Sequence, residues 1–243
     1  MSRTKIRPGV ISSRSVRKVF GHREGDRLFS DLFGTFDELT SAYDGLLAVR
    51  AAQTPLKTRE ANALELRRAV ARTTEIAKAK MNTVARKFIE TIQAKEKAAL
   101  ERAGVLSDPP GADEVRRAFR EMGHGPAGDK ARADALQAAA KRGDSVVLAA
   151  IRNAPSPITT GGFSSPPGMV IDAFVSDQNP GYVDSVQELR DALQHMNIVE
   201  EAFEKGADGL RDREAEASAD AGHARAEAAT RQLRGALGID PMA

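Results

Sequence analysis

Four histidines are the residues in this sequence that could bind a metal or carry acid–base chemistry. They are His22, His124, His195 and His223. A zinc site needs several His, Cys or carboxylate ligands at a characteristic spacing, such as two histidines one helical turn apart. The histidines here are isolated, and Asp191, one helical turn before His195, is the nearest approach to such a pair. We therefore expect no metal site.

Two short motifs match catalytic or phosphate-binding patterns only in part. Ser15 and Lys18 have the Ser-x-x-Lys spacing of penicillin-binding enzymes, but they lie in a basic segment without the other motifs of that site. Gly161 and Gly162 lie among serines and threonines, as in a phosphate-binding loop, but the lysine that a P-loop requires is missing. We therefore predict no catalytic residue and no cofactor, and we expect the chain not to be an enzyme.

Basic residues near the N-terminus are the strongest candidates for binding. Residues 1–28 carry eight basic and two acidic side chains. Flexible cations can reach phosphates without a preformed groove, so the segment predicts contact with a polyanion. Phe20 alone among the aromatic residues lies inside the charged run, which argues against base stacking. The candidate polyanion-binding residues are Arg3, Lys5, Arg7, Arg14, Arg17, Lys18 and Arg23.

The charges are distributed unevenly along the chain. Residues 57–103 carry twelve basic and six acidic side chains, which gives +6, whereas residues 154–243 carry seven basic and fifteen acidic ones, which gives −8. Such asymmetry indicates a polyanionic partner at the basic end or head-to-tail contact between copies. An acidic protein surface, including the acidic C-terminal half of the chain itself, is an equally good partner for the basic N-terminal arm.

Apolar residues at helical spacing indicate the elements that position these charges. The first stripe repeats every three or four residues, which predicts a helix with one bulky apolar face. Its residues are Phe29, Leu32, Phe36, Leu39, Tyr43 and Leu46. A second helix is expected to begin at Thr54 and Pro55, as N-cap and first helical residue, and to end near residue 103.

The second helix is the longest expected element. At 1.5 Å per residue it is about 70 Å long, and the helix before it is about half that length. A hairpin of these two helices leaves the distal half of the longer one without a partner. No neighbouring segment of the sequence supplies that partner.

Three shorter helices are expected next, and they form a small module. Asp113, Asp129 and Asp144 are their expected N-caps. Prolines and glycines over residues 154–168 exclude regular structure there, and the apolar run 169–175 is expected to be a short helix. The expected apolar contacts of the module are Val115, Phe119, Leu136, Val147, Leu148 and Ile151.

The last stripe lies on a long acidic helix that begins after Pro180-Gly181. Its residues are Val186, Leu189, Leu193, Met196, Phe203 and Leu210. Together the stripes predict an all-α protein in which long amphipathic helices form a hairpin or a coiled-coil-like bundle beside the small helical module. The expected segments are a basic extended arm (1–27), a long helical hairpin (28–104), the small helical module (105–155), a Pro/Gly-rich loop with a short apolar segment (156–181) and the C-terminal long acidic helix (182–243).

Composition excludes several other classes of protein. The chain has no cysteine, which excludes disulfide bonds and thiolate metal sites. No apolar run approaches the roughly 18 residues that span a bilayer, and the N-terminus lacks the apolar block of a secretory signal. We therefore expect a protein of a virion or of the cytoplasm, not secreted by a recognisable signal and without a membrane partner.

The order of the segments carries one resemblance. The sequence LQAAAKRGDSVVLAAIRNAPSPITTG at 136–161 lies between a long charged helix and a final long helix, with a Gly143-Asp144 helix cap before its apolar part. This arrangement resembles uncharacterised structural proteins of tailed bacteriophages. It covers about a tenth of the chain and defines no functional residue. The resemblance implies a virion component.

The unpartnered half of the longest helix indicates assembly. We expect a non-enzymatic helical structural or assembly protein whose two bulky stripes pack against other copies of the chain or against larger structural proteins. The alternative is a nucleic-acid-associated protein that uses the basic arm and the basic face of helix 57–103. Such a protein would bind phosphates without reading sequence.

Overall fold

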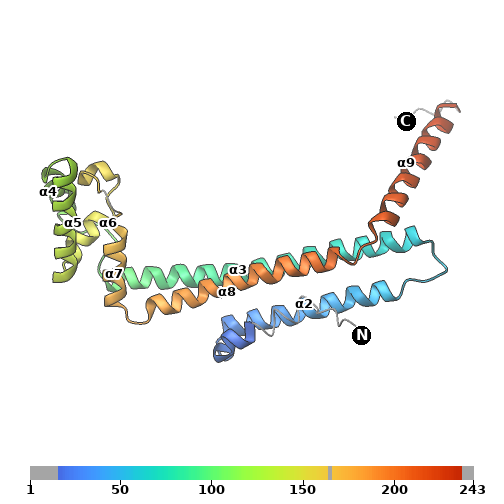
Figure 1. Ribbon diagram of the computed structural model, residues 1–243, viewed down its shortest axis with the longest axis horizontal. Coiled ribbons are helices and arrows are strands. Elements are labelled where there is room, and N and C mark those ends of the chain that lie inside the picture. Colours follow the sequence, from blue (N-terminus) through green and yellow to red (C-terminus); the bar gives the residue numbers. More distant parts are fainter. Residues whose placement is uncertain (1–15, 164–165, 237–243) are drawn as a thin grey trace. The chain divides into compact units, whose positions relative to one another are not determined.

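The computed structural model describes residues 16–163 and 166–236 (Figure 1). The regular elements within these ranges are all helical, which confirms the all-α prediction. The chain divides into two compact units: unit 1 contains Met1–Lys87 with Ala192–Ala243, and unit 2 contains Phe88–Asp191. The units combine segments that are distant in sequence, so they do not coincide with the five segments expected above.

Unit 1 is built around α2 (Arg27–Ala51), which carries the first apolar stripe. Asp26 caps this helix because its carboxylate accepts a hydrogen bond from the backbone N–H of Leu28 at 2.9 Å. The stripe is buried except for Tyr43, which is half-buried. The predicted apolar face is therefore confirmed, and it forms part of the core of unit 1.

A short helix precedes α2 where an extended arm was expected. Residues 16–20 are helical and lead into the 3-10 turn η1 (Gly21–Arg23). Val16 and Phe20 are buried, and the Phe20 ring lies 5.5 Å from the rings of Phe29 and His195. The expectation of an extended arm is therefore wrong over residues 16–23, because two apolar side chains one helical turn apart pack into the core.

The longest helix, α3 (Arg59–Arg102), begins later than the sequence predicts. Thr58 caps it, since the Thr58 hydroxyl accepts a hydrogen bond from the Ala61 N–H at 3.2 Å. The Thr54 hydroxyl instead accepts from the Leu56 N–H within the preceding loop. Thr54 was therefore the wrong choice of cap: both threonines have the chemistry, and the loop places Thr58 at the helix start.

Helix α3 contributes to both units, and its partners lie far along the chain. In unit 1, Leu66 and Val70 of α3 pack with Leu46 and with Ala207 and Leu210. Ala207 belongs to α8 (Tyr182–Asp208), which runs beside α3 in Figure 1. In unit 2, Ala99 of α3 packs in the core cluster that includes α7 (Gly168–Gln178). The prediction that half of this helix lacks a partner within the chain is therefore wrong.

Unit 2 contains the small helical module. Its helices are α4 (Ala112–Glu121), α5 (Gly125–Arg142) and α6 (Ser145–Arg152), followed by the 3-10 turn η2 (Pro157–Thr160) and α7. All six apolar residues expected to pack together do so, with Phe119, Leu136, Leu148 and Ile151 buried. The helical prediction for residues 169–175 is also confirmed, within the longer α7.

One of the three predicted caps in this module is correct. Asp144 caps α6, because its carboxylate accepts from the Val147 N–H at 3.2 Å. Asp113 lies inside the first turn of α4, whose N-cap is Gly111 at a φ of 82°. Helix α5 begins before Asp129, since proline is already favourable in the first turn, and Asp129 instead pairs with Arg132.

The C-terminal segment is two helices instead of one. Helix α8 ends at Asp208, and α9 (Arg213–Ala236) begins after a turn at 209–212. Asp212 caps the new helix by accepting from the Ala215 N–H at 3.1 Å. The expectation of one continuous helix is therefore wrong, because Gly209 and a capping aspartate interrupt the apolar stripe.

Candidate functional site

The two bulky stripes predicted to meet other molecules are core residues. On α2, Phe29, Leu32, Phe36, Leu39 and Leu46 are buried, and the half-buried Tyr43 ring lies 6.4 Å from that of Phe203. On the C-terminal stripe, Val186, Leu189, Met196, Phe203 and Leu210 are buried and Leu193 is partly buried. These side chains therefore form no exposed assembly surface in the described fold.

The candidate polyanion-binding residues fall into two groups. Arg3, Lys5, Arg7 and Arg14 lie outside the described residues. Arg17 pairs with Asp37 at 2.6 Å and its guanidinium lies 5.6 Å from the centre of the Phe33 ring. Arg23 pairs with Asp26 at 3.0 Å, and Lys18 is exposed. Two of the three described cations are thus engaged within unit 1, and binding of a polyanion stays a prediction.

Five basic residues of α3 pair with acidic residues among the described residues of unit 1. Arg59 pairs with Asp212 at 2.8 Å and with Glu214 at 3.0 Å, and Arg67 pairs with Asp220 at 2.8 Å. These acids belong to the C-terminal half, which the sequence indicated as one candidate partner for the N-terminal arm and not for this helix. Lys57, Lys78, Lys80 and Lys87 make further ion pairs. The opposite charges of the two segments therefore stabilise contacts inside unit 1.

These ion pairs shift the acid–base equilibria of the carboxylates. Hydrogen bonds from Arg59 and Arg67 lower the pKa of Asp212 and Asp220, respectively, below the ordinary value of 3.8. A lowered folded-state pKa means that both carboxylates stabilise the fold above their unfolded-state pKa and lose this contribution as the pH falls through the folded-state value.

Acid should therefore weaken unit 1 below about pH 4. The free energy of unfolding of the natural protein is expected to fall more steeply from pH 5 to pH 2 than that of an Asp212→Asn/Asp220→Asn variant. Urea titrations followed by circular dichroism at each pH measure this slope. Asp177→Asn, an exposed change in unit 2, should leave the slope unchanged. Equal slopes in the natural protein and the double variant would contradict the assignment.

An open apolar groove lies between α2 and α3 in unit 1. Its two adjoining parts have volumes of about 580 and 390 Å³ and share Thr35, Glu38, Ile76 and Lys80. Small residues line much of it, and a Cβ added at Gly34 or Gly45 would meet no atom within 4 Å. We call this surface the α2–α3 groove.

The residues along this groove have the spacing of a helix-packing seam. On α2 the positions 31, 35, 38, 42, 45 and 49 line it, and on α3 the positions 69, 73, 76, 80, 83 and 87. Alternating steps of four and three place such residues on one face of each helix. Val49 and Ile76 are 41% and 50% exposed, so the apolar part of the seam is open to solvent.

Charged residues accompany the seam on both helices. Lys80 pairs with Glu38 at 2.5 Å and Lys87 with Asp31 at 2.6 Å, which joins α2 to α3. Beside the seam, α3 carries exposed arginines that make no ion pair with the described residues. They are Arg68, Arg72 and Arg86.

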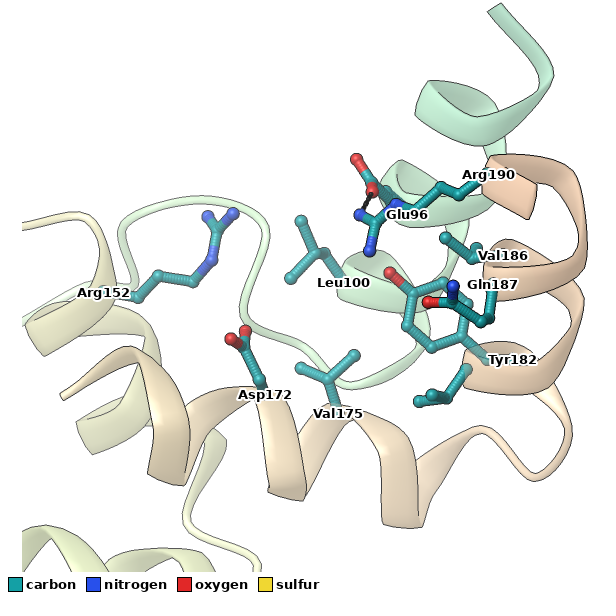
Figure 2. A pocket seen from close by; sticks show the side chains of 10 residues that line it. Glu96, Leu100, Arg152, Asp172, Val175, Tyr182, Val186, Gln187 and Arg190 are labelled. Atoms are coloured by element: carbon teal, nitrogen blue, oxygen red, sulfur yellow. Dashed lines mark hydrogen bonds and ion pairs between the residues drawn. The ribbon is translucent and has the colours of Figure 1, made fainter. Parts of the chain in front are cut away.

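A separate pocket of about 320 Å³ lies in unit 2 (Figure 2). Helices α3, α6, α7 and α8 each contribute to its lining. Leu100, Val175, Val183 and Val186 form its apolar part. Its polar part consists of Glu96, Arg152, Asp172, Tyr182, Gln187 and Arg190. Arg190 donates to Glu96 at 2.8 Å, so this charged pair is already formed at one side of the pocket.

Sequence reasoning missed both the groove and the pocket. Gly34 and Gly45 are three helical turns apart and therefore share a face of α2. That spacing was the available signal for an open groove. The pocket residues come from four helices and have no common linear spacing, so no pattern in the sequence marks them.

No other class of site emerges from the described part of the chain. Within it, no three His, Asp or Glu side chains come together as metal ligands. Among the same residues, no helix combines the length and apolar character that crossing a bilayer requires. Comparisons with known protein families, curated proteins and solved structures gave no match.

Proposed function

We propose that the chain is a non-enzymatic helical structural or assembly protein that binds a second copy of itself through the α2–α3 groove. The observation that carries the proposal is the open seam: small and apolar residues follow heptad positions on two adjacent helices, and Val49 and Ile76 are half exposed. The resemblance of the segment order to structural proteins of tailed bacteriophages supports a place in a virion.

The charges on the two helices favour a second copy as the occupant. Helix α2 contains four acidic and two basic residues, whereas the outer surface of α3 carries Arg68, Arg72 and Arg86. A two-fold axis parallel to the groove places α2 of each copy against α3 of the other. The net acidic α2 of each copy then faces the arginines of the other copy's α3, as in an interface that is complementary to itself. Asp31, Asp37 and Glu38 of α2 also pair with cations of their own chain.

Ile76 would be buried at this interface, so a substitution at Ile76 tests the proposal. Size-exclusion chromatography with light scattering, over a range of concentrations, should show the natural protein approaching the mass of a dimer. Ile76→Glu places a charge in the seam and should weaken association at least about tenfold, because an unpaired charge would have to be buried.

Ile89→Glu supplies the matched control for this experiment. Ile89 lies on the same helix, is 46% exposed and does not line the groove. Its variant should associate as the natural protein does. A natural protein that stays monomeric at every concentration, or equal effects of the two substitutions, would contradict the proposal.

A further inference from the structure

The pocket in unit 2 contains opposite charges that are not paired with each other. Arg152 of α6 and Asp172 of α7 both line it, and Figure 2 shows them on the side away from Tyr182. Arg152 donates one hydrogen bond from Nη1, to the Asn153 side chain at 3.1 Å, which leaves the rest of its guanidinium available. The Asp172 carboxylate accepts no hydrogen bond from the described residues.

This arrangement differs from the other charged groups of the pocket. Glu96 and Arg190 neutralise each other at 2.8 Å, so they offer a ligand little net charge. Arg152 and Asp172 offer one positive and one negative group toward the same space. A ligand that carries one positive and one negative group could pair with both Arg152 and Asp172. A simple anion would be repelled by Asp172, and a simple cation would be repelled by Arg152.

Tyr182 and the apolar residues define the remainder of the ligand. Burial and the nearby Glu96 carboxylate raise the pKa of Tyr182, so its hydroxyl stays neutral and can donate a hydrogen bond at physiological pH. Leu100, Val175 and Val186 provide apolar contact. A volume of about 320 Å³ lies at the lower end of the range for small-molecule sites.

We propose that this pocket binds a small zwitterion, an α-amino acid with an apolar side chain. Its carboxylate pairs with Arg152, its ammonium group pairs with Asp172, and its side chain contacts Leu100 and Val175. The pocket lies in unit 2 and shares no residue with the α2–α3 groove. The proposal therefore does not depend on association of two copies.

Titration calorimetry of the full chain with three related probes tests this assignment. Leucine carries both charges, 4-methylpentanoate keeps the carboxylate, and 3-methylbutylamine keeps the ammonium group. Leucine is expected to bind at least about tenfold more tightly than either analogue, because only leucine pairs with both side chains. Absence of saturable leucine binding up to about 10 mM would overturn the proposal.

Substitutions then assign each charge to its partner. Arg152→Gln should weaken leucine and 4-methylpentanoate but leave 3-methylbutylamine unchanged, whereas Asp172→Asn should weaken leucine and the amine but spare the acid. Arg142→Gln, an exposed arginine of α5 outside the pocket, should change none of the three. Circular dichroism checks that every variant is folded. Equal loss of all probes in both pocket variants, or a loss in the Arg142 variant, would contradict the assigned contacts.

Discussion

Replacing Phe36 with alanine is expected to lower the free energy of unfolding by about 3 to 5 kcal/mol. Phe36 has 0% exposure and lies in the middle of the buried stripe of α2. The substitution removes the apolar area of the ring from the core and leaves a cavity that neighbouring side chains fill only in part. Urea unfolding of the natural and substituted proteins, followed by circular dichroism, measures the difference.

A conservative change in the same unit but outside the α2–α3 groove calibrates the Phe36 result. Ile198→Ala removes apolar surface from a residue of α8 that is 54% exposed, so it should change the free energy of unfolding by no more than about 0.5 kcal/mol. If Phe36→Ala were as mild as Ile198→Ala, the Phe36 side chain would not belong to a packed core. The Phe36 side chain would then be available for contact with a partner.

Replacing Arg132 with methionine should destabilise unit 2 by about 3 to 5 kcal/mol. The Arg132 side chain is only 1% exposed. Its Nε donates to the Gly162 carbonyl at 2.6 Å, Nη1 donates to the Gly123 carbonyl at 2.5 Å, and Nη2 pairs with Asp129. Methionine fills most of the space but leaves two backbone carbonyls and a carboxylate without these donors. Buried acceptors that lose their donors lower the free energy of unfolding, because no water replaces the lost hydrogen bonds.

Hydrogen exchange identifies where the Arg132 substitution acts. Amides of α5 and of the segment around Gly161 should lose protection in Arg132→Met, since the guanidinium joins the start of α5 to the loop after η2. Gly161 has a φ of +80°, and a Cβ there would lie 3.0 Å from Arg132 Nη1, so the loop approaches the guanidinium closely. Arg142→Met on the exposed end of α5 is the control. Equal protection in the two variants would contradict the structural role of Arg132.

Local periodicity was sufficient to predict much of the fold. The spacing of Phe29, Leu32 and Phe36 encodes a buried helix face, and the structure has that face. Asp144 was identified as a cap because capping depends on the residues immediately beside it. The choice between Thr54 and Thr58 depends on the path of the whole loop, and local chemistry does not distinguish them.

Pairing between distant helices could not be predicted in the same way. The contacts of Arg59 with Asp212 and of Arg67 with Asp220 join residues about 150 positions apart. The opposite net charges of the two segments are compatible with such contacts, but many different pairings of basic with acidic residues would satisfy the same charges. The inference of assembly from a helix without a partner therefore rested on a wrong premise, because the distal half of α3 packs within unit 2. There Ala99 belongs to a core cluster with residues of α7, and Glu96 pairs with Arg190 of α8.

The proposal of assembly rests on the α2–α3 groove, whereas the sequence indicated the two bulky apolar stripes. Bulky residues such as Phe36 and Phe203 attract attention in a sequence, and they are the ones that the chain buries itself. The α2–α3 groove is lined by Gly34, Ala42, Gly45 and other small residues. Their side chains are too small to fill the space between the two helices, so the groove stays open. A pattern search for large apolar side chains does not find such a surface.

Cysteine cross-linking tests association through this groove most directly, because the natural chain contains no cysteine. The ion pairs Glu38–Lys80 and Asp31–Lys87 fix the antiparallel register of α2 and α3. A two-fold axis parallel to the groove preserves this register, so Ser41 of one copy comes nearly level with Ala79 of the other. Both positions are exposed and accept cysteine without loss of core packing.

Chains with Ser41→Cys and chains with Ala79→Cys are mixed, oxidised and separated by mass. We predict a cross-linked dimer that joins the two variants, much less cross-linking of either variant alone, and none between Ser41→Cys and Ser218→Cys, an exposed position on α9. Cross-linking of Ser41→Cys to Ser218→Cys as efficiently as to Ala79→Cys, or no dimer in any mixture, would contradict association of two copies through the α2–α3 groove.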